Sequence, residues 1–184
     1  MTAELVRQAQ AGDHGAFDTL IGAAYDRMIA IAYRILRDPT LAEDATQDAV
    51  VRCWRDLRGL REPDRFEAWL HRLLVNACRD LARHNRRRPA EVLGTRLETP
   101  DAGDEYGRLA DHDALERAFL QLPADQRIAL VLTHYVGYSA PELATILKVP
   151  TGTVYSRLHY GARAMREALA GSPSSSSAAS EPLR

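Results

Sequence analysis

Apolar residues recur every three or four positions through most of this 184-residue chain, which is the spacing of an amphipathic helix. The longest such stretch predicts a helix over residues 15–37. Asp38-Pro39 ends it, because proline cannot continue the backbone hydrogen-bond ladder. Shorter stretches with the same period lie on both sides, so the pattern as a whole predicts an all-α fold.

Helix-start signals organise the first half of the chain. Thr2 is the cap expected for a short first helix. Thr40-Leu-Ala-Glu43 and Asp64-Arg-Phe-Glu67 each have the spacing of a capping box, and each predicts the start of a further helix. Together with the long helix, they predict one compact helical domain over residues 1–88.

A change of composition separates this domain from the rest. Residues 89–108 contain prolines, glycines and acidic side chains without apolar periodicity, which is typical of a flexible linker. Helical periodicity returns over residues 109–170 and predicts a second small helical domain. The Ser-rich segment 171–184 is low in complexity, and we expect it to be a disordered tail.

The second domain contains the most informative stretch. Ser139-Ala-Pro-Glu142 is a capping box that starts a short helix, and the turn Lys148–Gly152 leads into another. Two helices joined by so tight a turn form a helix-turn-helix pattern, although an ordinary helical hairpin has a similar outline. The second helix leaves on its outer face side chains that suit DNA phosphates and base edges: Thr153, Tyr155, Ser156, Arg157, His159 and Arg163.

Charge is distributed unevenly although the net charge is only −1. Arginines dominate residues 65–88, whereas acids dominate the connector that follows. A basic helix beside a linker predicts a polyanion-binding surface, although a charge run alone is usually a solvated face. Arginine contacts phosphates, asparagine reads base edges and tryptophan stacks on unpaired bases, so the candidates in this helix and the preceding loop are Arg61, Arg65, Trp69, Arg72, Asn76, Arg79 and Arg83.

The helix that follows Pro39 has a separate polar stripe. Asp44, Gln47, Asp48 and Arg52 stand at mutual offsets of three and four, so they share one face. A solvated surface and a protein-docking face both fit this pattern.

Several motifs, taken in this order and spacing, resemble the extracytoplasmic-function (group 4) sigma factors of the sigma-70 family. The resemblance spans roughly residues 3–170. The motifs that carry it are Gly12-Asp-x-x-Ala-Phe17, Ala42-Glu-Asp-x-x-Gln-Asp48, Phe66-x-x-Trp-Leu-x-Arg-x-x-x-Asn-x-x-Arg-Asp80, Leu122-Pro-x-x-x-Arg127, Gly137-Tyr-Ser-x-x-Glu-Leu-Ala144 and Pro150-x-Gly-Thr-Val-x-Ser-Arg-Leu158.

The resemblance implies a role for each surface. The first domain would be sigma domain 2, which docks on the coiled coil of the largest polymerase subunit through the stripe Asp44–Arg52. Its basic helix and the loop over residues 60–65 would melt the promoter's minus-10 element and hold a flipped base. The second domain would be sigma domain 4, which contacts the polymerase flap and reads the minus-35 element. Many relatives are also held by an anti-sigma factor.

Other function classes have little support. The six histidines are scattered without metal-ligand spacing, and no nucleophile or phosphate-binding motif is present, so we expect no enzyme, metal or cofactor. Cys53 and Cys78 have the pattern of buried free thiols. A stand-alone helix-turn-helix regulator would explain residues 109–170 but not the basic helix. No secretory signal or membrane span is recognisable, and we expect a cytoplasmic protein.

Overall fold

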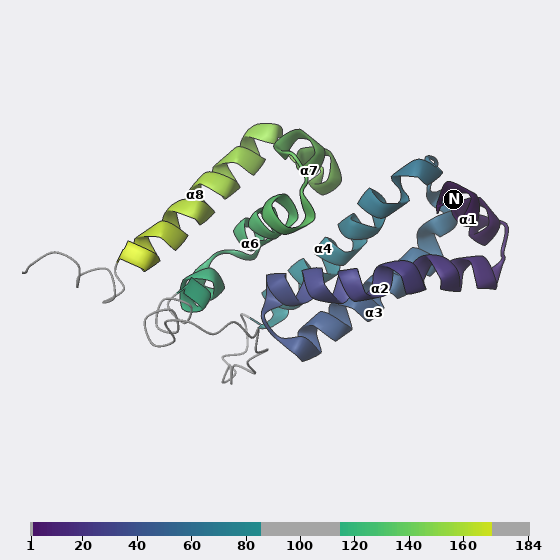
Figure 1. The fold of residues 1–184 in the computed structure, drawn as a ribbon, viewed down its shortest axis with the longest axis horizontal. Helices are drawn as coiled ribbons and strands as arrows, with labels where there is room; N and C mark the ends of the chain where they lie inside the picture. Colours follow the sequence, from purple (N-terminus) through teal and green to yellow (C-terminus); the bar gives the residue numbers. More distant parts are fainter. Residues whose placement is uncertain (1, 86–114, 171–184) are drawn as a thin grey trace, which may run out of the picture.

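The computed structural model describes residues 2–85 and 115–170, and all regular elements in these two ranges are helical (Figure 1). The predicted linker 89–108 and the predicted tail 171–184 lie outside the described residues. The elements of the first range are α1 (Thr2–Gln10), α2 (His14–Leu36), α3 (Pro39–Asp56), the short turns η1 (Leu57–Gly59) and η2 (Pro63–Arg65), and α4 (Phe66–Asn85). The predicted all-α fold is confirmed.

The first four helices pack as one bundle around α2. The predicted apolar stripe of this helix lies in the core, where Met28, Ile31 and Ile35 are fully buried. Asp13 caps the helix by accepting a hydrogen bond from the Ala16 backbone N–H at 3.1 Å. Opposite it, α3 presents a strip of small buried residues, which lets the two helices approach closely.

Two predicted helix starts are wrong in detail. The cap of α3 is Asp38, whose carboxylate accepts a hydrogen bond from the Leu41 N–H at 2.9 Å. Pro39 therefore follows the end of α2 and is also the first residue of α3. At the second site the capping box does not form. The chain makes the 3₁₀ turn η2 there, and α4 begins only at Phe66. A fixed proline φ suits the first turn of a helix, and both proline-led starts use it.

The second range forms a smaller helical group. A helix over residues 115–121 leads into α6 (Ala124–Val131), which continues as the π-helical turn η3 (Leu132–Val136) and is followed by α7 (Ala140–Leu147) and α8 (Thr151–Ala170). Gly137 ends this turn, with φ at +96° in the left-handed region. Arg127 is buried and donates to the backbone carbonyls of Leu120 and Leu122, at 3.0 and 3.1 Å, which fixes the end of the preceding helix against α6.

The two groups pack against each other in the free chain. Helices α6 and α7 lie along α4, and α6 with η3 reaches α2 (Figure 1). Apart from Leu122, the buried apolar residues of both groups belong to one continuous cluster. Within the described ranges, no helix combines the length and the apolar character that crossing a membrane requires.

Candidate functional site

The loop between α3 and α4 forms one wall of a small cavity that is lined by both polar and apolar side chains. The cavity has a volume of about 260 Å³. Its lining includes four residues named from the sequence: Arg61, Arg65, Trp69 and, one turn further along α4, Arg72. Half-buried Trp69 supplies a flat ring, and the arginines supply positive charge, which is the combination that holds an unpaired nucleotide.

Gln10 fixes the shape of this loop. Its side-chain amide donates to the carbonyls of Leu57 and Leu60, at 2.9 and 2.8 Å, and so ties the end of α1 to the turn that precedes the cavity. Sequence reasoning missed this residue, because a polar residue at the end of a short helix has no periodicity that would mark a tertiary contact. The loop is therefore held by side-chain bonds to its backbone rather than by apolar packing alone.

The outer face of α4 carries the remaining members of the predicted polyanion surface. Arg72, Asn76 and Arg79 are half-buried along one line, and Arg83 is exposed near the helix end. Arg79 donates to the Asn76 amide oxygen at 3.2 Å, which orders both side chains. The structure thus places all seven residues on one continuous stretch, from the loop to the last turn of α4.

The helix-turn-helix pattern corresponds to α7, a tight turn and α8. The predicted capping box is present, since the Glu142 carboxylate accepts from both the backbone N–H and the hydroxyl of Ser139, at 2.8 and 2.6 Å. These bonds lower the pKa of Glu142. Lys148, with φ at +54°, makes the left-handed turn. Val154, on the inner face of α8, is buried.

The six side chains named on α8 do not all face solvent. Tyr155, Ser156, His159 and Arg163 are exposed, and Thr153 is half-buried. Arg157, in contrast, retains only 19% of its side-chain exposure and is paired with Asp125 of α6. The helical period placed it on the outer face, but this part of that face is covered by a neighbouring helix.

The polar stripe on α3 divides into two parts. Asp44 and Gln47 are exposed, whereas Asp48 and Arg52 belong to an ion-pair chain in which Arg52 contacts Asp48 at 2.6 Å and Asp80 of α4 at 3.3 Å. This chain attaches α3 to α4 and orients its polar edge.

Two large apolar residues on α3 are exposed and extend the outer part of the stripe. Val51 is 63% exposed and Trp54 is 43% exposed, and they follow Gln47 at steps of four and three. Trp54 is held by ring contacts with His14 and Phe17, each with centroids 4.8 Å apart. No sequence pattern indicates this exposure, since apolar residues at helical spacing normally indicate core.

A buried histidine lies where the two helical groups meet. The Nδ1 of His71, on α4, lies 2.8 Å from the hydroxyl of Tyr138, which follows η3. Burial lowers the pKa of His71 to about 4, while the neighbouring Glu67 raises it and Arg27 lowers it. Burial also raises the pKa of Tyr138. The ring is therefore neutral at physiological pH and forms a structural hydrogen bond between the groups.

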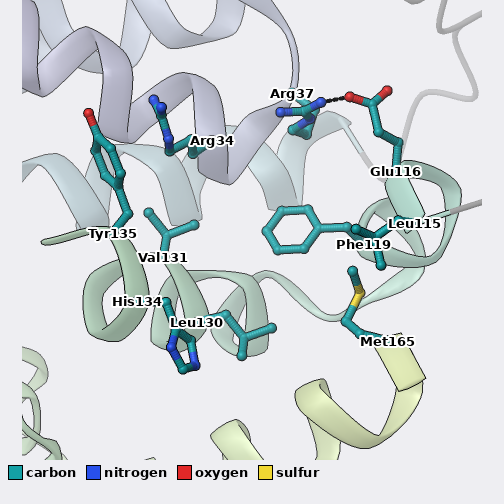
Figure 2. Close-up of a pocket in the computed structure, with 10 residues that line it drawn as sticks. All are labelled: Arg34, Arg37, Leu115, Glu116, Phe119, Leu130, Val131, His134, Tyr135 and Met165. Atoms are coloured by element: carbon teal, nitrogen blue, oxygen red, sulfur yellow. Dashed lines mark ion pairs between the residues drawn. The ribbon is translucent and has the colours of Figure 1, made fainter. Parts of the chain in front are cut away.

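A larger apolar cavity of about 440 Å³ lies at the other end of this boundary (Figure 2). Phe119, Val131 and other side chains of the second group form its floor, while Arg34 and Arg37 reach it from α2. The Arg34 guanidinium lies 3.7 Å from the centre of the Tyr135 ring, and Arg37 pairs with Glu116. Both arginines are thus engaged in contacts between the groups.

Family models match the two helical groups separately. The model described as sigma-70 region 2 matches residues 20–88, and that described as sigma-70 region 4 matches residues 112–165. The matches together cover more than half of the chain. The region 2 match contains the α3 stripe and the α4 surface, and the region 4 match contains the outer face of α8.

Relatives and solved structures agree with these matches. The chain is 34% identical over 155 residues to the ECF RNA polymerase sigma factor SigM of Mycobacterium tuberculosis, covering 84% of this chain and 78% of SigM. It resembles the structure of CnrH in complex with the cytosolic domain of CnrY, with a TM-score of 0.65, 29% identity, and coverage of 92% of this chain and 97% of CnrH.

A second structure supports the fold alone. It is the sigma factor RpoE in complex with the anti-sigma factor NepR from Bartonella quintana, with a TM-score of 0.60, 24% identity, and coverage of 84% and 97%. These matches exclude the two alternative functions, a stand-alone helix-turn-helix regulator and an enzyme. Sigma factors are non-catalytic subunits that bind core RNA polymerase and promoter DNA. The chain belongs to the extracytoplasmic-function sigma factors of the sigma-70 family and directs transcription initiation by RNA polymerase.

Proposed function

We propose that α3 is the surface that docks on core polymerase, through the coiled coil of its largest subunit. The supporting observation is the exposed strip of Asp44, Gln47, Val51 and Trp54, because a solvated apolar pair beside polar groups is typical of a protein interface. Asp48 and Arg52 border the strip and hold it in place.

This docking surface is tested by capture of purified core polymerase on the immobilised chain. We expect Val51→Arg to weaken capture at least tenfold, because it places a charge in an interface centre without disturbing the fold of an exposed position. Ala23→Arg, at an exposed position of α2, is the matched control and is expected to bind as the unaltered chain does. Equal capture by both variants would remove this face from the docking model.

We propose that the cavity beside η1 and η2 receives a flipped base of the minus-10 element, with the α4 arginines on the adjoining phosphates. Its volume, its tryptophan and its positive charge together support this role. The contact residues are Arg61, Arg65, Trp69, Arg72, Asn76, Arg79 and Arg83. Run-off transcription with core polymerase, on DNA from upstream of the chain's own gene, tests it. Arg72→Ala should reduce initiation at least tenfold while core capture stays unchanged.

We propose that α8 reads the minus-35 element with Thr153, Tyr155, Ser156, Arg157, His159 and Arg163. The exposed tyrosine and histidine and the basic residues fit a major-groove helix. Arg157→Ala should lower transcription from a promoter that contains a minus-35 element and leave core capture intact. An equal loss of capture would contradict the assignment of this helix to DNA.

Two further partners complete the proposal. The second helical group would contact the polymerase flap, as the family assignment implies, and an anti-sigma factor would hold the chain inactive in the cytoplasm. Support for the latter comes from a protein that shares the fold, the sigma factor RpoE, whose structure was solved in complex with the anti-sigma factor NepR. Affinity purification of the chain from its own host, followed by mass spectrometry, tests both. Recovery of polymerase alone in uninduced cells would argue against an anti-sigma partner.

A further inference from the structure

One carboxylate joins the two surfaces that are assigned to DNA. Asp125, in the first turn of α6, lies between Arg79 of α4 and Arg157 of α8. One oxygen contacts the Arg79 Nε at 2.6 Å, and the other contacts an Arg157 terminal nitrogen at 2.6 Å. Both arginine side chains are more than four-fifths buried in this arrangement, at 16% and 19% exposure.

Helix α7 covers the cavity assigned to the flipped base. Thr145 and Ile146 of α7 complete its wall opposite Trp69 and Arg72. Ile146 is buried in this position, with 6% exposure. A nucleotide strand that enters the cavity along α4 therefore has to displace α7.

Three polar contacts bridge the rest of this boundary, beside the apolar cluster that the two groups share. They are the His71–Tyr138 hydrogen bond and two contacts whose residues Figure 2 shows, the Arg34–Tyr135 cation–π contact and the Arg37–Glu116 ion pair. When the boundary opens, water replaces the bonds of these polar groups, while the shared apolar surface opposes opening. One terminal nitrogen of Arg157 is buried with no hydrogen-bond partner among the described residues. When the two groups separate, this nitrogen can form a hydrogen bond that it lacks in the closed form.

We propose that Asp125 acts as a clasp that holds the free chain closed, with the second helical group covering the minus-10 surface. This proposal rests on the DNA contacts proposed above. In it, Asp125 is a positioning residue, because it holds Arg79 and Arg157 in place and does not itself contact DNA. Its carboxylate occupies the guanidinium donors of Arg79 and Arg157 that DNA phosphates would otherwise take. Promoter DNA and the clasp then compete for the same two arginines, and the chain binds DNA only in its open form.

Closure is tested first, without DNA. In full-length chain carrying Arg34→Cys and Tyr135→Cys, a short bis-maleimide joins the two groups only while they are packed. Cys53 and Cys78 are buried, and burial raises the pKa of each thiol to about 12, so they do not compete. Adding Asp125→Asn should slow crosslinking at least twofold. Glu4→Gln, which removes an acid and an ion pair from α1, is the control and should leave the rate unchanged.

Occlusion is tested second, by fluorescence anisotropy of a labelled forked DNA from upstream of the chain's own gene. Because apparent affinity scales with the open fraction, a tenfold weaker clasp in Asp125→Asn tightens binding by up to about tenfold. The crosslinked chain should bind at least tenfold more weakly than the same variant before crosslinking.

The two assays separate the clasp from the DNA assignment. Crosslinking at the same rate with and without Asp125→Asn would overturn the clasp, whatever the DNA result. Undiminished binding by the crosslinked chain would overturn occlusion. An absence of forked-DNA binding by every variant, with core polymerase present, would overturn the proposed minus-10 role and the competition built on it, while a slower crosslinking rate would still establish Asp125 as the closing contact.

Discussion

Acidification should weaken the folded chain through His71, and the size of the effect follows from its burial. The folded pKa is about 4, whereas the ordinary value is 6.5. Between these values the unfolded chain binds a proton that the folded chain excludes, so stability is complete above pH 6.5 and falls as the pH drops toward 4. At about 1.4 kcal/mol per pH unit of pKa difference, the loss is roughly 2 kcal/mol at pH 5 and roughly 3 kcal/mol at pH 4.

Two variants isolate this contribution from the other titrating groups. His71→Phe removes the titratable ring, and Tyr138→Phe removes only its hydrogen-bond partner. Thermal unfolding is followed by circular dichroism at pH 7.5 and pH 5.0. The unaltered chain should lose about 4–8 °C more in Tm between these conditions than His71→Phe does. Tyr138→Phe should keep most of the pH dependence, because the imidazole stays desolvated.

The refuting result is a His71→Phe variant whose Tm falls with pH as steeply as that of the unaltered chain. It would mean that the imidazole is protonated in the folded state, with Glu67 outweighing both desolvation and Arg27. A uniformly lower Tm at both pH values would report only the lost hydrogen bond, about 1 kcal/mol.

Three further outcomes are expected. Gly137→Ala should lower the free energy of unfolding by about 1–2 kcal/mol in urea titration, because φ is +96° there; an unchanged value would contradict the left-handed turn. Arg127→Met should cost about 3 kcal/mol, since it removes two buried hydrogen bonds to the end of the helix over residues 115–121; full retention of stability would show that water replaces them. Cys53 and Cys78 should react with a thiol reagent only on unfolding, measured by absorbance, and fast labelling of either would argue against their burial.

Local patterns in the sequence were enough to place most helices and to find the helix-turn-helix. The Ser139–Glu142 capping box and the inward face of α8 depend on spacing within a few residues, and spacing is visible in one dimension. The two mistaken helix starts show the limit of the same reasoning. Asp38 and Thr40 both have the chemistry of a cap, and the choice between them depends on how Pro39 continues the helix.

Contacts between the two helical groups were beyond the reach of periodicity. Helical period correctly predicted that Arg157 lies on the outer face of α8. In the folded chain, however, Asp125 of α6 covers it. Periodicity within α8 contains no information about which residue of another helix the tertiary fold brings there. The exposure of Val51 and Trp54 was missed for a related reason. An apolar residue facing solvent has the same sequence signature as one facing the core, and only the packing of the bundle distinguishes the two.

The π-helical turn η3 makes the register between α6 and α7 sensitive to chain length. Such a turn accommodates one more residue than an α-helical turn does, and here it ends at Gly137. Deleting a single residue from Leu132–Val136 would restore α-helical bonding and rotate everything downstream by about 100°. Tyr138 would then turn away from His71, and α7 and α8 would change their orientation relative to α6 together. Insertions and deletions at this turn are therefore a route by which descendants of this chain can acquire a different arrangement of the two domains without any change in the helices themselves.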